Sequence, residues 1–356
     1  MQKILTILGT RPELIRLSRV IPKLDRLSKL TFVYTNQNFT PNLRDIFFAD
    51  LGLRQPDYYF EQKGSLGEQL ADIFPKIEKL FIEIRPDKVF ILGDTNSALC
   101  AIIAERMGIP VYHAEAGNRS YDKKIPEEVN RRLIDSISSY NLTYTQTSKE
   151  ALIHDGCHCK KVFLCGNPTK EVLEYYKDKI LSSEILNKLG LNNKDYYLAD
   201  FHRSENVNTK DRLLEIINGL NRLAKETTVV CSIHPHTLDR IKAFNIIADK
   251  RVIMLPAMGF FDFVKLEQNC KVGLTDSGLV SEELNLLKVP CVIMRDTTER
   301  PEAVEAGGAI ISGINAERIY ESTKIIEKVT NWQTPVGWDD LNVSDRIVHY
   351  ILGERQ

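Results

Sequence analysis

The sequence predicts an α/β protein of two halves, each with a parallel sheet between layers of helices. Short, nearly continuous apolar runs recur along the 356 residues, and helical patterns separate nearly all of them. Strands that are apolar throughout are buried on both faces, as in parallel sheets covered by helices. The twelve runs are too many for one small doubly wound sheet, and they divide into two sets of six.

The elements follow in order along the chain. The first set of runs predicts strands at residues 3–8, 30–35, 88–93, 110–116, 141–146 and 161–166. The second set predicts strands at residues 196–201, 227–235, 251–256, 271–276, 290–295 and 309–313. Examples of the helical patterns between them are residues 65–84, 97–108 and 210–226. We place the boundary after "GNP", which gives domains of residues 1–168 and 169–339, followed by a helical tail at 340–356.

Composition excludes several classes of protein. The chain is 43% hydrophobic and 27% charged, as expected of a globular protein, and its net charge of -1 favours neither nucleic acid nor an acidic membrane surface. No apolar run approaches the roughly 18 residues of a membrane span, and "MQKILTILGT" is no signal peptide. We therefore expect a cytoplasmic protein with reduced thiols among its seven cysteines.

A metal site is not expected. The stretch "CHC" places Cys157, His158 and Cys159 side by side, but a zinc site needs a second pair of ligands and the sequence offers none.

Parallel sheets bind ligands beyond the carboxyl ends of their strands, so the residues after each strand are informative. The first strand is followed by "GTRPEL", in which Thr10 can cap a helix with Glu13 as its capping-box partner. Arg11 and Arg16 then fit either an anion site at the helix start or a solvated surface. The pattern leaves both interpretations open.

Acidic residues follow two further strands of the first half. Asp94 ends the third strand, where it could cap a helix, and Glu115 ends the fourth strand on the same face as His113 by the period of two. The next helix begins "PEEVNRR", with Glu127 in its first turn. Taken singly, Asp94 is explained by a helix cap and Glu115 by a surface loop, and the first-turn glutamates are explained by dipole complementarity with i,i+4 pairs. Their concentration at one sheet edge favours a site.

The second half repeats this arrangement of polar strand ends. His202 and Arg203 follow one strand, and His234 follows the next, although a loop histidine is more often a structural hydrogen-bonding group. "LTDSGLVSEE" then opens a helix at Ser277 and Gly278, which suits a phosphate at a helix N-terminus. The remaining candidates lie a turn further on or after the next strand: Glu282, Glu283, Arg295 and Arg300.

Together these segments resemble the non-hydrolysing UDP-N-acetylglucosamine 2-epimerase family. The segments that match are "GTRPE", "GDTNS", "HAEAGNR", "PEEVNRR", "HRSEN", "LTDSG" with "SEE", and "RDTTERPEA", in the family's order. The resemblance implies a glycosyltransferase-B-type fold: two Rossmann-like domains with parallel sheets facing a central cleft, and a C-terminal helix that packs back on the first domain. Leu279 and Arg16 depart from the family's usual glycine and lysine, and "EAGNRSYD" looks like a branch acting on UDP-linked 6-deoxy-L-hexosamines.

The resemblance also implies residue roles and partners. It implies inversion at C2 of a UDP-N-acetylhexosamine by elimination of UDP and re-addition, with catalytic positions at Asp94, Glu115, Glu127 and His202. It implies UDP or substrate contacts at Arg11, Arg16, Arg131, Arg203, His234, Ser277, Gly278, Glu283 and Arg300. It implies a role in polysaccharide biosynthesis, a homodimer, and a second, activating UDP-sugar held by Gln37 and Arg44. No cofactor is expected, because "GTRPEL" is not a GxGxxG loop and no hydride is transferred.

Three other activities remain open from the sequence. A glycosyltransferase on the same fold would transfer the sugar to an acceptor, a hydrolysing relative would release free sugar, and a nucleotide-sugar sensor would bind without turnover. The several acids at the strand ends favour elimination and re-addition.

Overall fold

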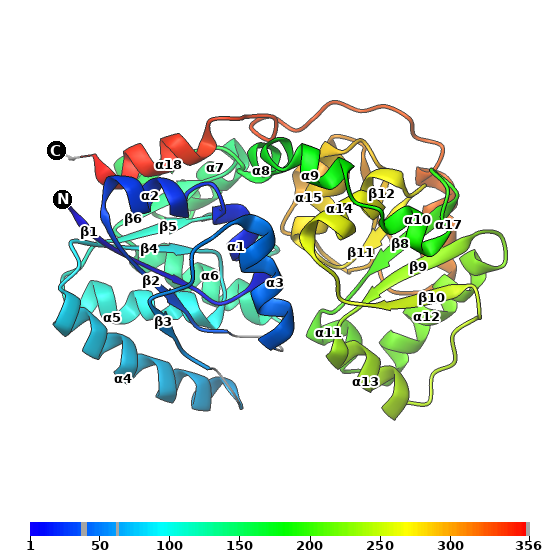
Figure 1. Ribbon diagram of the computed structural model, residues 1–356, viewed down its shortest axis with the longest axis horizontal. Coiled ribbons are helices and arrows are strands. Elements are labelled where there is room, and N and C mark those ends of the chain that lie inside the picture. The colour runs from blue at the N-terminus through cyan, green and yellow to red at the C-terminus, as the bar shows by residue number, and fades with distance from the viewer. Residues whose placement is uncertain (37–40, 62–63, 354–356) are drawn as a thin grey trace. The chain divides into compact units, whose positions relative to one another are not determined.

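The chain forms two compact α/β units (Figure 1). The computed structural model describes residues 1–36, 41–61 and 64–353, and for residues 41–45 it describes the backbone only. Unit 1 comprises Met1–Glu174 and Val336–Gln356, and unit 2 comprises Tyr175–Pro335.

Unit 1 contains a parallel sheet in the order β3-β2-β1-β4-β5-β6-β7. Its strands are β1 Lys3–Leu8, β2 Lys29–Tyr34, β3 Tyr58–Tyr59, β4 Lys88–Leu92, β5 Val111–Ala114, β6 Tyr140–Thr143 and β7 Val162–Leu164. Six of them confirm predicted strands. Strand β3 was not predicted, because a two-residue strand paired only to β2 leaves no periodic pattern in the sequence.

Helices cover both faces of the unit 1 sheet. They are α1 Arg11–Leu17, α2 Ile21–Leu27, α3 Pro41–Leu51, α4 Leu66–Ile84, α5 Ala101–Arg106, α6 Pro126–Ile137, α7 Gln146–His154, α8 Thr169–Tyr175 and α18 Val343–Leu352, with the short 3-10 helices η1 Asn96–Cys100 and η2 Cys159–Lys161. One core cluster joins Ile7, Val89 and Ile91 of the sheet to Ile77 of α4 and Ile134 of α6. In Figure 1, α2 and α18 lie beside each other on the other side of the sheet from α4.

The C-terminal helix α18 belongs to unit 1. The ring of Tyr350 stacks on that of Phe163 in β7, with centroids 3.9 Å apart. Glu171 of α8 accepts a hydrogen bond from the backbone nitrogen of Ser344 at 2.8 Å, and Lys23 of α2 bonds to Asp345. These contacts also hold α8 to unit 1, and the division between the two compact units lies between Glu174 and Tyr175, at the last residue of α8, a few residues beyond the predicted boundary at 168.

Unit 2 contains a second parallel sheet, in the order β10-β9-β8-β11-β12-β13. Its strands are β8 Tyr196–Asp200, β9 Thr228–Ile233, β10 Val252–Pro256, β11 Gly273–Thr275, β12 Cys291–Ile293 and β13 Ala309–Ile311. Its helices are α9 Lys177–Leu181, α10 Ile185–Leu189, α11 Ser204–Val207, α12 Lys210–Ala224, α13 Pro235–Ala243, α14 Phe260–Asn269, α15 Gly278–Leu286, α16 Pro301–Glu305 and α17 Ala316–Ile326. All six strands match predicted ones.

Within unit 2, helices α12 and α17 approach each other closely. Gly219 of α12 faces Ile319 of α17, and a Cβ atom at Gly219 would lie 3.0 Å from that side chain. The two helices cover the sheet face that carries Ala199, Val229 and Leu274.

The strand orders fix where a ligand can bind. In each sheet the first strand is central: β1 lies between β2 and β4, and β8 lies between β9 and β11. The direction of strand addition reverses at that strand, and parallel sheets of this kind bind ligands beyond the carboxyl ends next to the reversal. The turns after β1, β4, β5, β8, β11 and β12 are therefore the candidate positions for ligand-binding residues.

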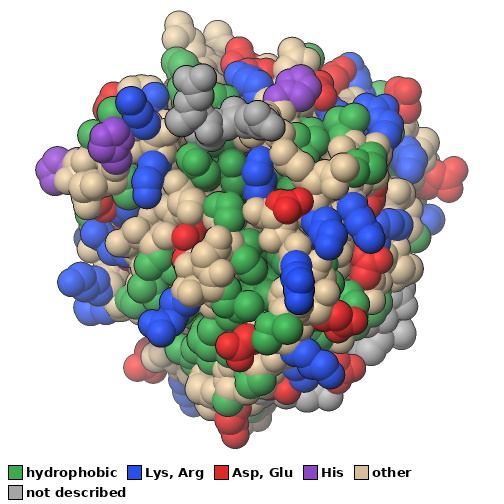
Figure 2. Space-filling view, turned by 90° about the vertical axis from the view of Figure 1, so that its left-hand side faces the viewer, with side chains coloured by type: hydrophobic (Ala, Val, Ile, Leu, Met, Phe, Trp, Pro, Cys, Tyr) green, Lys and Arg blue, Asp and Glu red, His purple; other side chains and the backbone are tan. Residues whose placement is uncertain are grey.

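One face of the molecule mixes polar and apolar side chains (Figure 2). Figure 2 shows a face of the molecule on which hydrophobic side chains lie among acidic and basic ones. Within the described ranges, no helix combines the length and apolarity needed to cross a membrane.

Replacing Tyr350 should weaken the attachment of α18. Tyr350→Ala removes a stacked ring from a half-buried site, so we expect the unfolding free energy to fall by about 1–3 kcal/mol. Urea titration followed by circular dichroism measures the change. His349→Ala, at an exposed neighbouring position, is the matched control. Equal midpoints for both variants would show that the ring stack does not hold the helix.

Candidate functional site

The turn after β1 is organised by the buried carboxylate of Glu13. It accepts hydrogen bonds from the backbone nitrogens of Gly9 at 2.9 Å and Thr10 at 2.7 Å, and from the Thr10 hydroxyl at 2.7 Å. Its other oxygen lies 3.3 Å from the hydroxyl of Thr95, which follows β4. The predicted pairing of Thr10 with Glu13 is confirmed, and Glu13 also links the turns after β1 and β4.

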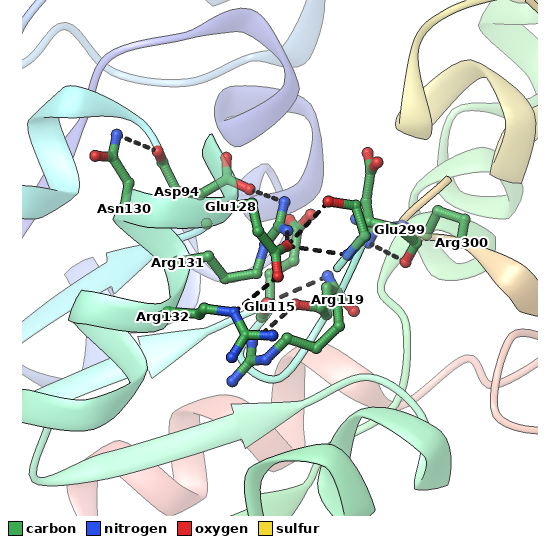
Figure 3. Close-up of polar contacts among 12 residues, drawn as sticks. Asp94, Glu115, Arg119, Glu128, Asn130, Arg131, Arg132, Glu299 and Arg300 are labelled. Atoms are coloured by element: carbon green, nitrogen blue, oxygen red, sulfur yellow. Dashed lines mark hydrogen bonds and ion pairs between the residues drawn. The ribbon is translucent and has the colours of Figure 1, made fainter. Parts of the chain in front are cut away.

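The turn after β4 presents Asp94 to a guanidinium group (Figure 3). Arg131 of α6 donates one hydrogen bond to the Asp94 carboxylate and another, at 2.6 Å, to Glu128. Asn130 donates to the backbone carbonyl of Asp94 at 3.0 Å. Residues on α6 therefore fix both the backbone and the side chain of Asp94.

Glu128 has a larger role than the sequence suggested. As a second acid in the first turn of the "PEEVNRR" helix, Glu128 is predicted by the sequence pattern to be a surface or helix-stabilising group, together with Arg132. The i,i+4 contact with Arg132 is present at 3.0 Å, but the Glu128 side chain is fully buried. It also accepts hydrogen bonds from the Ser120 backbone nitrogen and hydroxyl. The helix-stabilising contact with Arg132 is confirmed, whereas the surface position is not, because the Glu128 carboxylate is buried against Ser120 and Arg131.

Glu115 lies just beyond the strand that carries it. β5 ends at Ala114, and Glu115 has a left-handed φ of 65°. The prediction that residues 113 and 115 share a strand face therefore does not apply. The Glu115 carboxylate pairs with the guanidinium of Arg16 from α1, and both side chains are buried. Gly117 then turns the chain at φ 84°, where a Cβ atom would lie 2.2 Å from the Ser148 carbonyl oxygen.

A second buried network contacts the turn that carries Glu115, and it was not predicted from the sequence. It joins His113 of β5 to Asp135 of α6, and Asp135 to Arg119. Alone, burial would raise the pKa of Asp135, but His113 and Arg119 outweigh burial and lower it. The only sequence signal was that Asp135 follows Glu128 by seven residues, which places both on one face of a helix.

The other two candidates of unit 1 are partly exposed. Glu127 lies in the first turn of α6, beside Glu128 and near the N-terminus where the helix dipole favours a carboxylate. Arg11, in the first turn of α1, has its guanidinium carbon 5.6 Å from the ring centroid of Phe47. The turns after β1, β4 and β5 and the start of α6 thus bring arginines and carboxylates to one edge of the unit 1 sheet.

In unit 2, Asp276 organises the turn after β8. This buried carboxylate follows β11 and accepts hydrogen bonds from the backbone nitrogens of His202 at 3.0 Å and Arg203 at 3.0 Å, and from Asn206 at 2.9 Å. The His202 side chain is 38% exposed, and its Nδ1 lies 3.8 Å from both Asp276 and Asp200. Asp276 therefore holds the backbone while the imidazole of His202 stays accessible.

The start of α15 packs against the segment after β12. Gly278 approaches so closely that a Cβ atom would lie 2.8 Å from the Glu299 carboxylate. Glu299 pairs with Arg295 at 2.5 Å and with Arg203 at 3.2 Å. Arg300 donates to the fully buried Glu282 of α15. The expected phosphate segment, Ser277 with Gly278, therefore lies beside three arginines, and Glu299 is a member of this cluster that sequence reasoning did not select.

His234 and Glu283 differ in their surroundings. His234 caps α13, because its Nδ1 accepts a hydrogen bond from the backbone nitrogen of His236 at 3.3 Å. This is the structural role that a loop histidine more often has. Glu283 of α15 is buried and only 2% exposed.

The "CHC" stretch also has structural contacts. His158 accepts from the backbone nitrogen of Lys160 and caps η2, and Cys157 lies 3.9 Å from Asn141. Among the residues that the structure describes, no three acidic, histidine or cysteine side chains converge as metal ligands.

Two Rossmann-like units, each built on a parallel sheet, are typical of the glycosyltransferase-B class of fold. A family model described as UDP-N-acetylglucosamine 2-epimerase matches residues 23–352. The chain is 38% identical to the UDP-N-acetylglucosamine 2-epimerase of Methanocaldococcus jannaschii, over 94% of this chain and 95% of that protein. It is 33% identical to the UDP-2,3-diacetamido-2,3-dideoxy-D-glucuronate 2-epimerase of Pseudomonas aeruginosa, over 90% and 91%.

The solved structures agree with this match. The crystal structure of the Methanocaldococcus jannaschii enzyme in complex with UDP-GlcNAc and UDP aligns with a TM-score of 0.93 at 37% identity, covering 98% of this chain and 99% of that one. The chain belongs to the non-hydrolysing UDP-N-acetylglucosamine 2-epimerase family and is an isomerase.

The titration of Glu13 gives a test of the turn after β1. Burial raises its pKa from 4.5 to about 7, against the hydrogen bonds from Thr10 and Gly9, which lower it. The folded state thus binds this proton more tightly than the unfolded state. The stability that it contributes is present below about pH 4.5 and is lost as the pH rises through about 7.

We therefore expect the stability of the wild type to fall relative to Glu13→Gln as the pH rises. The difference in unfolding free energy should change by on the order of 3 kcal/mol between about pH 4.5 and about pH 8. Urea titrations of both proteins across this range provide the measurement. Parallel pH profiles would mean that the pKa of Glu13 is the same in the folded and unfolded states.

Proposed function

We propose that this isomerase inverts C2 of a UDP-N-acetylhexosamine. One observation carries the proposal: Asp94 and Glu115 follow two neighbouring parallel strands, β4 and β5, and each carboxylate is paired with a guanidinium, from Arg131 and Arg16. With Glu127 at the start of α6, this sheet edge supplies several groups able to accept or donate a proton.

The reaction would proceed by elimination and re-addition. A base removes the C2 proton while the C1–O bond breaks, the bonding pair leaves with the UDP oxygen, and a C1=C2 double bond forms in a glycal. The UDP oxygen then attacks C1 while C2 takes a proton on its other face. Atoms and electrons balance without any redox partner. The route needs acids and bases on both faces of the sugar and cations on the departing diphosphate.

We assign these roles to the residues singled out in the sequence. Asp94, Glu115 and Glu127 would handle the C2 proton, and His202 would contact the departing diphosphate. The substrate or UDP contacts would come from Arg11, Arg16, Arg131, Arg203, His234, Ser277, Gly278, Glu283 and Arg300, with Glu283 on the ribose and Arg131 either fixing Glu127 or reaching the substrate. The exposed imidazole of His202 and the arginines beside Gly278 support the assignment of unit 2 to the diphosphate. Nδ1 of His234 accepts the capping hydrogen bond from the backbone of His236. A contact between His234 and the substrate would therefore come from the other atoms of the ring.

For the sugar, we propose UDP-GlcNAc with UDP-ManNAc as its epimer, or a UDP-2-acetamido-2,6-dideoxy-L-hexose. The relatives named for UDP-N-acetylglucosamine support the first of these, and the relative named for UDP-2,3-diacetamido-2,3-dideoxy-D-glucuronate shows that a similar chain is named for a modified sugar. The second, matching "EAGNRSYD", would place the product in polysaccharide biosynthesis. Incubation of the protein with each UDP-sugar in deuterated water, followed by NMR, distinguishes them by which one takes up deuterium at C2.

The same experiment separates the alternative activities. Deuterium at C2 without an acceptor supports the epimerase, whereas transfer only when an acceptor is added would identify a glycosyltransferase. Stoichiometric release of UDP with free sugar would identify a hydrolysing enzyme. UDP binding with no change in the sugar would identify a sensor.

Substitution of the proposed acids should abolish exchange without preventing binding. We expect Asp94→Asn, Glu115→Gln and Glu127→Gln each to lower kcat about 10²–10⁴-fold, as removal of an acid or base typically does. Titration calorimetry should still detect UDP. Asp72→Asn, which removes an exposed carboxylate of α4 in the same unit, is the control and should retain full activity. Full activity in all three acid variants would refute the assignment.

The remaining proposals concern assembly and location. We propose a cytoplasmic homodimer, supported by the family membership, and sedimentation velocity would test the dimer. A second, activating UDP-sugar stays a prediction, because Gln37 lies outside the described residues and the side chain of Arg44 is not described. Sigmoidal kinetics would support it.

A further inference from the structure

A fully buried histidine connects the two strands that carry the proposed acids. His113 of β5 has no exposed surface, and its Nε2 lies 2.8 Å from the carbonyl oxygen of Gly93. Gly93 immediately precedes Asp94 and has a left-handed φ of 72°. The imidazole thus holds the backbone at the point where the chain leaves β4 and turns towards Asp94.

The other ring nitrogen of His113 contacts α6. Its Nδ1 lies 3.0 Å from the carboxylate of Asp135, which is only 2% exposed. Asp135 also accepts hydrogen bonds from the backbone nitrogen of Gly117, at 3.2 and 3.3 Å, and from Arg119 at 2.6 Å. Gly117 is two residues beyond Glu115, so this carboxylate holds the turn in which Glu115 adopts its left-handed conformation.

These contacts make one continuous chain between the two acids. From Asp94 it runs through the Gly93 carbonyl to His113, from His113 to Asp135, and from Asp135 to the turn around Glu115. The side chains of the two acids are held separately, by Arg131 and Arg16. Backbone and side-chain positions are thus fixed by different groups, and substitutions can test the backbone contacts alone.

We propose that His113 and Asp135 are positioning residues for the reaction at C2, an inference that rests on the proposed function. Their burial excludes contact with substrate, so they act through the backbone of Asp94 and Glu115. Imidazole suits this task because its two ring nitrogens reach groups on opposite sides of the ring. A displacement of about 1 Å in a reacting group can lower a rate about 100-fold, so the effect on turnover should be measurable.

The histidine offers two substitutions that each preserve one contact. The amide of His113→Gln can reach the Gly93 carbonyl oxygen in place of Nε2 but loses the contact with Asp135. The shorter His113→Asn can replace Nδ1 at Asp135 but does not reach Gly93. Asp135→Asn keeps the shape of the side chain and removes its charge.

Asp155→Asn is the matched control. Asp155 is the second carboxylate bonded to Arg119, at 2.9 Å, but its side chain is 28% exposed. The structure places it against Arg119, Arg132 and His154 rather than His113. This variant therefore perturbs the same arginine without touching the contacts to Gly93 and Gly117.

The test compares turnover, binding and folding in the whole protein. Two kinetic measurements are needed: kcat and KM with the UDP-sugar that the wild type epimerises, and the isotope effect on kcat when that sugar is deuterated at C2. The Kd for UDP reports on binding, and the thermal midpoint reports on folding. We expect both His113 variants and Asp135→Asn to lower kcat about 10- to 100-fold. The isotope effect should increase, because proton removal becomes more rate-limiting, while the Kd for UDP stays within about threefold of the wild-type value. Asp155→Asn should match the wild type.

Other outcomes overturn the inference. Folded His113 variants with wild-type kcat and isotope effect would refute it, as would an equal loss of kcat in Asp155→Asn. If Asp135→Asn does not fold, the two His113 variants decide. A wild type that exchanges no deuterium at C2 refutes the proposed function itself, whereas exchange that persists unchanged in the variants refutes only the positioning role.

Discussion

Buried carboxylates that bind the backbone N–H groups of turns are the constraint on which both units depend. Parallel strands end in turns whose N–H groups have no ladder partner, and such groups must be satisfied when they are buried. Glu13, Glu128, Asp135 and Asp276 each do this for a turn beyond a strand. A carboxylate suits the task because it accepts several hydrogen bonds at once and forms strong bonds with N–H donors.

For two of these acids, Glu128 and Asp135, neighbouring cations offset the cost of burial. An isolated buried carboxylate would be strongly unfavourable, whereas Glu128 and Asp135 lie against Arg131 and Arg119. The same arginines then reach further groups: Arg131 contacts Asp94, and Arg119 contacts Asp155. Stability and site geometry therefore depend on the same charged network, so removal of one partner leaves its neighbour buried without compensation.

Much of the fold and part of the candidate site followed from the sequence. The strands were predictable because apolar runs bounded by turn residues are a local signal, and β3 was missed because two residues carry no such signal. Asp94, His202 and Ser277 were found because they follow strands directly. The burial of Glu128 was not predictable, since it depends on a segment that folds over α6, and a first-turn glutamate is ordinarily a surface residue. Asp135 and Glu299 escaped notice because their partners are distant in sequence: Asp135 contacts residues 16 to 22 positions away, and Glu299 contacts Arg203.

The return of residues 336–353 to unit 1 has a consequence for biosynthesis. During translation, the ribosome releases these residues only after all of unit 2 has been made. Until then the aromatic surface of Phe163 and Tyr140, which Tyr350 covers in the finished protein, has no partner from α18. The N-terminal part of unit 1 therefore stays incompletely packed until α18 has been synthesised. Unit 2, whose residues are continuous in the chain, can fold as soon as they have emerged from the ribosome.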